Sequence, residues 1–319
     1  MLFEYAVEPK AIGSSWQNFR YWIEKFGFDR GRLISEFPKT WLREVHTAAA
    51  RMKDIERARV TESLALAKRS KLVRYRRPYV PTLGGWLENA IVQHAASPFH
   101  AIIAENNPDA LSFVLLADEM HELHPLMMSA RTWEVERVGP SLAHAMEPLL
   151  RSARTVLFVD RFFDISEERY RDTLRACLQI LHANGGTAVR CEIHYCDHDE
   201  RPSVDFVEQN APRWLRGVIP AGMCVTLFSW SEKDGGEDFH ARYLLTDVGG
   251  ISIDAGFSAE GIHQRVPLGL LDSGFCESKL LAFDRSSTIY DLVEPVLQID
   301  SDGTVLRIQF PHAITQNGC

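Results

Sequence analysis

The chain has 319 residues, of which 45% are hydrophobic and 24% are charged, and this composition excludes a disordered or fibrous protein. Its formal net charge of −8 excludes a uniformly basic surface but leaves room for a local basic region. The six cysteines lack the spacing of a disulfide framework, and the first ten residues contain no basic stretch followed by an apolar one. We therefore expect a cytoplasmic protein with reduced thiols, no secretory signal and no membrane segment.

The N-terminal 130 residues are predicted to be mainly α-helical. Apolar residues recur at helical spacing over 41–71, and a second helical pattern covers 86–104. Residues 111–118, with the sequence LSFVLLAD, have the composition of a strand. We predict a helical domain over 1–130 that binds nucleic acid or a partner protein.

A basic segment lies within this domain. Residues 51–77 contain ten lysines and arginines against three acids, a net charge of +7 in an otherwise acidic chain. One interpretation is a solvated helix face, and the other is a surface that contacts a phosphate backbone. The second interpretation assigns nucleic-acid binding to the densest part of the segment, namely Lys68, Arg69, Lys71, Arg74, Arg76 and Arg77.

From residue 131 to the end at 319, helical and strand patterns alternate. Helices are predicted over 141–154, 166–182 and within 197–216, and strands over 155–160, 188–196, 223–230, 279–283 and 304–310. This order predicts an α/β domain with a largely parallel sheet flanked by helices. We expect the strand end at Asp160-Arg161 to line a cleft at the carboxyl edge of that sheet.

A compact motif follows the third of these strands. His240, Arg242 and Asp247 stand in the order H-x-R-x4-D at the head of an apolar run, and Gly249-Gly250 then predicts a hairpin turn. On a strand, alternate residues share a face, so the imidazole and the guanidinium would project together, about 6–7 Å apart. That pair suits the binding of a phosphoryl group while a nitrogen attacks it.

The motif resembles the H-x-K-x4-D signature of the phospholipase D superfamily, with Arg242 where that family has lysine. The later turn, Gly256 to Ala259, has the glycine and serine of the family's second signature but lacks its asparagine. The resemblance spans about 135–311 and implies a phospholipase D-like mixed sheet, no cofactor and no metal. It also implies that His240 is either the nucleophile that forms a phosphohistidine or the acid that protonates the leaving oxygen, that Arg242 clamps the phosphate and that Asp247 is an orienting carboxylate.

One copy of the motif supplies one histidine, whereas the family's chemistry uses two. We therefore expect a two-fold homodimer that brings two copies of His240 together. Three residues are assigned supporting roles: Ser258 donates to the phosphate, and Asp272 or Glu277 holds the far nitrogen of the imidazole.

The resemblance and the basic segment together predict a metal-independent phosphodiesterase that cleaves nucleic acid, DNA rather than RNA. A restriction or phage-defence nuclease, with a separate sensor or ATPase partner, fits by analogy. Two alternatives stay open: a nucleic-acid-binding or assembly module that has lost turnover through Arg242, and a lipid phosphodiesterase. A rival metal site at His194, Cys196 and His198 is the weaker interpretation, because alternate residues of one strand rarely converge on one ion.

Overall fold

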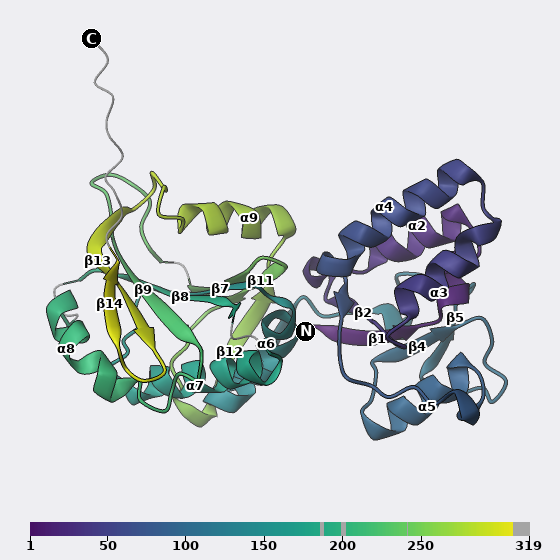
Figure 1. Ribbon diagram of the computed structural model, residues 1–319, viewed down its shortest axis with the longest axis horizontal. Helices are drawn as coiled ribbons and strands as arrows, with labels where there is room; N and C mark the ends of the chain where they lie inside the picture. The colour runs from purple at the N-terminus through teal and green to yellow at the C-terminus, as the bar shows by residue number, and fades with distance from the viewer. Residues whose placement is uncertain (186–187, 199–201, 241, 309–319) are drawn as a thin grey trace, which may run out of the picture. The chain divides into compact units, whose positions relative to one another are not determined.

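The computed structural model describes residues 1–319 except 186–187, 199–201, 241 and 309–319. The chain divides into two compact units (Figure 1). The first comprises 1–134, 248–250 and 268–273, and the second comprises 135–247, 251–267 and 274–319.

The first unit contains a five-stranded parallel sheet in the order β3-β2-β1-β4-β5. Its strands are β1 (Phe3–Val7), β2 (Arg32–Ser35), β3 (Leu72–Val73), β4 (Ala101–Ala104) and β5 (Val114–Leu116). The prediction of a mainly α-helical domain was therefore wrong. Each strand is a short apolar run, and such a run cannot be distinguished from a buried piece of helix by periodicity alone.

Helices cover both faces of this sheet. They are α1 (Pro9–Gly13), α2 (Trp16–Lys25), α3 (Trp41–Ala48), α4 (Asp54–Ser70) and α5 (Trp86–Ala96), and Figure 1 shows α2 to α4 on one side and α5 on the other. Strand β1 demonstrates the two-sided burial: Tyr5 and Val7 join one apolar cluster, and Ala6 joins the other. Alternate residues of a strand point to opposite faces, so the unit has two cores on one sheet.

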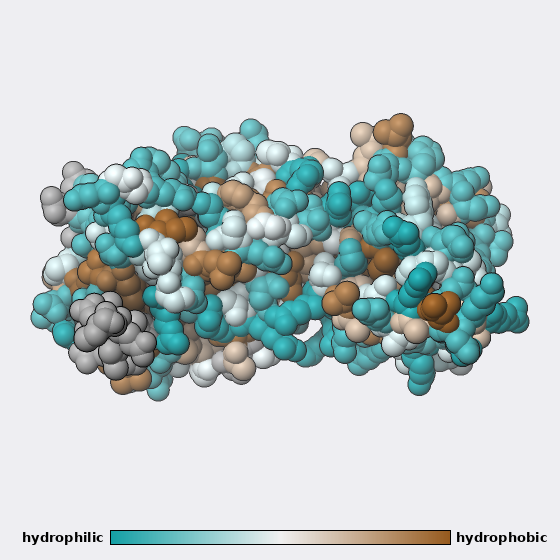
Figure 2. Space-filling view, turned by 90° about the horizontal axis from the view of Figure 1, so that it is seen from above, coloured by the Kyte–Doolittle hydropathy of each residue, from teal (hydrophilic) through white to brown (hydrophobic). Residues whose placement is uncertain are grey.

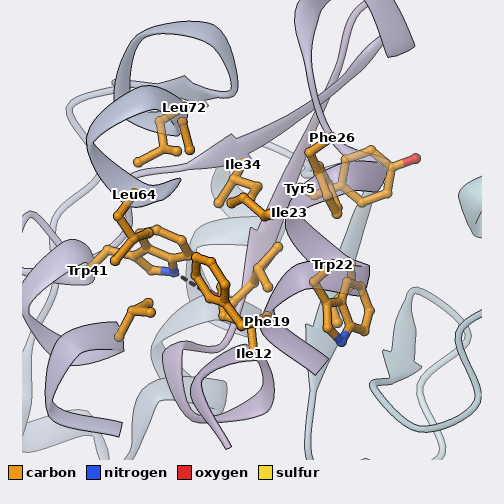
Figure 3. Close-up of a cluster of buried hydrophobic side chains, with 14 of the residues drawn as sticks. Tyr5, Ile12, Phe19, Trp22, Ile23, Phe26, Ile34, Trp41, Leu64 and Leu72 are labelled. Atoms are coloured by element: carbon orange, nitrogen blue, oxygen red, sulfur yellow. Dashed lines mark hydrogen bonds between the residues drawn. The ribbon is translucent and has the colours of Figure 1, made fainter. Parts of the chain in front are cut away.

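The larger cluster centres on Trp41. Its buried indole packs among residues that include Ile12, Phe19 and Leu64 (Figure 3). The indole Nε1 donates a hydrogen bond of 2.6 Å to the carbonyl oxygen of Val7 at the end of β1. Trp41 thus fixes the first turn of α3 to the central strand of the sheet.

The second unit is built on a nine-stranded mixed sheet in the order β14-β13-β9-β8-β7-β10-β11-β12-β6. Strands β7, β8 and β9 are parallel, whereas β10 runs antiparallel to β7, and β13 runs antiparallel to β9 and β14. The strands are β6 (Thr132–Arg137), β7 (Thr155–Asp160), β8 (Arg190–Cys196), β9 (Cys224–Ser231), β10 (Arg242–Thr246), β11 (Gly249–Ile253), β12 (Gly261–Leu270), β13 (Asp291–Asp300) and β14 (Val305–Ile308). The prediction of a mixed α/β sheet is confirmed, but the prediction that it is largely parallel was wrong, because β7–β8 and β8–β9 are parallel while β10–β7, β13–β9 and β13–β14 are antiparallel.

Helices α6 (Gly139–Ser152), α7 (Glu168–Ala183) and α8 (Val204–Trp214) alternate with strands β7 to β9 as predicted, and α9 (Ser273–Ala282) lies on the other side of the sheet from α6 and α7 (Figure 1). The predicted strand over 279–283 was wrong, because most of that stretch forms the end of α9. Among the described residues, no helix is both long and apolar enough to cross a membrane. On the face shown in Figure 2, hydrophobic side chains form separate patches among hydrophilic ones.

Replacing Trp41 by alanine is expected to lower the free energy of unfolding by about 3–5 kcal/mol, because it leaves a large cavity and removes the partner of the Val7 carbonyl group. Urea denaturation followed by circular dichroism measures the loss. Trp16→Ala is the control, since Trp16 belongs to the same unit but is only partly buried against this cluster. An equal loss in both variants would contradict the central role of Trp41.

Candidate active site

The motif lies where β7 ends and β10 begins. In the antiparallel register, Arg242 faces Asp160 and Thr246 faces Val156. Because the two strands run in opposite directions, the end of β7 and the start of β10 form one edge of the sheet. That edge carries Asp160, Arg161 and Phe162 from one strand end and His240 and Arg242 from the other.

His240 precedes β10, and its side chain is 74% exposed. Among the described residues, its imidazole has two partners: Nε2 lies 3.1 Å from Asp238 Oδ2, and Nδ1 lies 3.4 Å from Arg161 Nη1. A guanidinium group can only donate, so Nδ1 acts as the acceptor. When the ring is neutral, its proton is on Nε2, which donates a hydrogen bond to the Asp238 carboxylate. The lone pair of Nδ1 then faces the Arg161 cation.

Glu232 connects Arg161 to the segment before the histidine. Its Oε1 lies 3.2 Å from Arg161 Nη1 and accepts a hydrogen bond of 2.6 Å from the backbone N–H of Phe239. One carboxylate oxygen therefore holds both the cation and the backbone next to His240. Sequence reasoning missed Glu232 and Asp238, since neither belongs to the motif and both sit in a loop rich in acids.

Arg242 is the first residue of β10 and is held by two acceptors. Its Nε lies 3.7 Å from Asp160 Oδ1, and its Nη1 donates to the carbonyl oxygen of Asp254. Asp160 is buried, and its two carboxylate oxygens accept backbone bonds from Phe162 (2.9 Å) and Phe257 (3.0 Å). A buried carboxylate needs such partners, so Arg242 both neutralises Asp160 and is fixed by it.

The turn that carries Phe257 requires glycine at position 256. Gly256 has φ +74°, and a Cβ atom there would lie 2.0 Å from Asp160 Oδ2 and 3.0 Å from Arg242 Cδ. The family-like glycine thus allows the backbone to approach the buried carboxylate closely.

Ser258 does not fit its predicted role as a phosphate donor. The buried hydroxyl accepts a bond of 2.6 Å from Arg137 Nη2, and its single proton is directed to Glu260 Oε1 at 3.0 Å. That bond and the ion pair with Arg169 hold the pKa of Glu260 below its ordinary value. Ser258 therefore belongs to an internal polar network.

Asp247 lies at the opposite end of β10, five residues beyond Arg242, which on a strand is about 16 Å. Its Oδ1 accepts bonds from the backbone N–H groups of Arg154 (2.9 Å) and Thr155 (3.3 Å). The predicted orienting role was wrong: this carboxylate fixes the start of β7. The carboxylate that contacts the His240 ring in the described part of the chain is that of Asp238, whereas Asp272 and Glu277 had been predicted for this role.

His194 is not available as a metal ligand in this structure. It is fully buried and stacks on Phe228 at 4.8 Å between ring centroids. Its Nδ1 accepts a bond of 3.0 Å from Trp230 Nε1, and its Nε2 lies 3.2 Å from Glu192 Oε2. Cys196 is buried and His198 is exposed, and the described part of the chain contains no group of three side chains arranged to hold a metal ion.

Three of the predicted nucleic-acid-binding residues, Lys71, Arg74 and Arg77, make contacts within the first unit. Lys71 Nζ donates to the carbonyl oxygen of Phe26 (2.5 Å), and burial lowers its pKa. Arg74 pairs with Glu36, and Arg77 pairs with Glu4 at 2.5 Å while its guanidinium stacks over Phe99. Lys68, Arg69, Arg74 and Arg76 are exposed.

Comparison with known proteins adds no relative: no protein-family model and no curated protein sequence matches the chain.

Gly256→Ala is expected to destabilise the second unit by about 1–3 kcal/mol more than Gly217→Ala does, because the new methyl group clashes with Asp160. Gly217 is a matched control, with φ +73° and nothing within 4 Å of an added Cβ. Both variants share the cost of the left-handed backbone, so their difference in urea denaturation isolates the clash. Equal losses would show that the carboxylate moves aside freely.

The stability of the protein is expected to fall as the pH drops below 6.5, partly through His194. Burial lowers the pKa of His194 from its ordinary value of 6.5, so the unfolded chain binds this proton more readily than the folded one. The contribution of the neutral ring is complete above pH 6.5 and is lost as the pH falls toward the folded pKa. Protonation would also place a hydrogen on the nitrogen that accepts from Trp230.

The measurement is the free energy of unfolding between pH 5 and 8 for the wild type, His194→Gln and the exposed-site control His144→Gln. The slope below pH 6.5 should become shallower in His194→Gln and stay unchanged in the control. A slope that is the same in all three proteins would contradict the assignment.

Proposed function

We propose that this protein is a metal-independent phosphodiesterase that cleaves nucleic acid through His240. The observation that carries the proposal is that two cations lie with an exposed imidazole where β7 ends and β10 begins. The acceptor nitrogen of His240 faces the guanidinium of Arg161, and the guanidinium of Arg242 is held by a buried carboxylate. Two fixed cations beside a nucleophilic nitrogen suit a phosphodiester, whose transition state gathers negative charge on its equatorial oxygens.

The order of elements supports a relationship to the phospholipase D superfamily. Helix α6, strand β7, helix α7, strand β8, helix α8 and strand β9 precede the motif strand β10, which is the order that the resemblance implies. Arginine in place of lysine keeps the positive charge and adds a second donor, although it is bulkier.

In the proposed reaction, Arg161 shifts its hydrogen bond from His240 Nδ1 to a phosphate oxygen, and the freed lone pair of Nδ1 attacks phosphorus. A P–N bond forms while a P–O bond to one nucleotide breaks. The leaving oxygen takes a proton from a second imidazole. Water then attacks the phosphohistidine, gives a proton back to the second imidazole and releases His240. Asp238 keeps the attacking ring oriented through its other nitrogen.

The second imidazole is proposed to come from another copy of the chain. His240 is the single motif histidine, and its exposure leaves it accessible to a partner across a two-fold axis. A homodimer would also double the number of arginines around the phosphate. A role in restriction or phage defence, with DNA as the substrate and a separate sensor or ATPase, is consistent with this reaction.

A second candidate is a nucleic-acid-binding module without turnover. The observation that favours it is that Arg242 is already occupied by Asp160 and the Asp254 carbonyl group, so part of its fork is not directed to a substrate. A lipid phosphodiesterase is the third candidate and would release a head group from phospholipid vesicles.

The wild type is expected to cleave DNA, supplied both as plasmid and as a single-stranded oligonucleotide, in the presence of EDTA. His240→Ala should abolish cleavage, and Arg242→Ala should slow it by about 10²- to 10³-fold, the effect of removing one charge-stabilising donor. Arg242→Lys, which restores the family's residue, should retain more activity than Arg242→Ala. Gel analysis of the initial rate measures all four proteins.

His144→Ala is the control, because His144 is an exposed histidine on α6 outside the site. Cleavage that persists in His240→Ala would rule out this nucleophile. DNA binding without cleavage in both the wild type and His240→Ala would favour the binding module.

A further inference from the structure

Phe162 is an exposed aromatic side chain at the candidate active site. It follows Asp160-Arg161 at the end of β7, and 44% of the residue is accessible to solvent. The guanidinium carbons of Arg161 and Arg242 lie 5.7 Å and 5.4 Å from the centroid of its ring. The same two arginines that flank the proposed phosphate site therefore also flank this ring.

Phe162 lies in a turn that hydrogen bonds and a buried neighbour hold in place. Its backbone N–H donates to Asp160 Oδ1 at 2.9 Å, and the N–H of Phe163 donates to the Asp160 carbonyl oxygen at 3.0 Å. Phe163 is only 2% exposed and packs against Tyr170 and Phe257, with centroid distances of 5.0 Å and 6.2 Å. The buried neighbour and the buried carboxylate hold the turn, and Phe162 stays partly exposed beside the two arginines.

An exposed aromatic ring beside phosphate-binding cations has the composition of a site for single-stranded nucleic acid. Cationic side chains follow the backbone of such a strand, and aromatic side chains stack on its bases. In a duplex the base faces are already covered by neighbouring bases, so a stacking residue can act only on an unpaired or extruded base. A phospholipid head group offers no aromatic face to such a ring.

We propose that Phe162 stacks on a nucleobase next to the scissile phosphate and that the substrate is single-stranded nucleic acid. This inference rests on the proposed function, since the phosphate bound by Arg161 and Arg242 is the one attacked by His240. The ring then sets the register of the strand, placing the phosphate that follows the stacked base within reach of the imidazole.

The test measures binding in the full-length His240→Ala protein, so that no substrate is consumed. Fluorescence anisotropy in EDTA follows a labelled single-stranded oligonucleotide, the same strand with all bases removed, and a duplex of equal length. Phe162→Ala is expected to weaken binding of the single strand about 5- to 150-fold, the range for loss of one base–aromatic stack, and to leave binding of the abasic strand unchanged. Phe162→Trp should retain binding.

Phe206→Ala is the matched control. Phe206 is 49% exposed on α8, where its ring contacts Trp214 and has no flanking arginine among its contacts with described residues. Its removal should change none of the three affinities. A general loss of folding would weaken binding of the abasic strand as well, and the far-UV circular dichroism of each variant separates that case.

The possible failures are distinguishable. If the wild type cleaves nucleic acid in EDTA but Phe162→Ala binds the single strand as tightly as the parent, the stacking proposal is overturned and the nuclease proposal stands. Tighter binding of the duplex than of the single strand by the parent protein also overturns it. If none of the oligonucleotides binds, both proposals fall.

Discussion

The buried carboxylate of Asp160 is the interaction on which the candidate site depends. Asp160 is the last residue of β7. Its carboxylate accepts hydrogen bonds from the backbone N–H groups of Phe162 and Phe257 and balances the charge of Arg242. Removing a charged group from water costs several kcal/mol unless its partners are well placed, and here every partner comes from a different segment of the chain. The requirement to satisfy one carboxylate therefore brings together the end of β7, the start of β10 and the glycine turn.

This arrangement separates the residues that hold the site from those that would react. Asp160 and Gly256 are internal, whereas His240, Asp238 and Phe162 are exposed around them. Asp247 contributes from a distance, since it secures the first residues of β7 through backbone bonds at the other end of the hairpin. A motif that looks contiguous in sequence thus divides into a reactive end and a structural end.

The sequence was informative where elements are long and regular. The alternation from α6 to β9 followed from helical and strand periodicity, and the edge carrying His240 and Arg242 followed from the motif. The sheet of the first unit was not predictable in the same way, because strands of two to five residues are buried on both faces and have no alternation to detect. The partners of His240 were missed because Asp238 and Glu232 act through loop contacts, which no spacing rule describes. Ser258 was misassigned because its burial depends on Arg137, which lies 121 positions away in the chain.

Because some cations of the basic segment are paired internally, the segment would neutralise fewer phosphates than its charge implies. Lys71, Arg74 and Arg77 pair with a carbonyl group or carboxylates of their own unit, so each would have to leave that partner before it could neutralise a phosphate. On double-stranded DNA, each phosphate that a protein neutralises lowers the logarithm of the binding constant by about 0.9 for a tenfold rise in salt concentration. The salt dependence of binding would therefore be weaker than the six predicted phosphate-binding residues imply. Counting positive charges along the chain would overstate the number of phosphates that this segment neutralises.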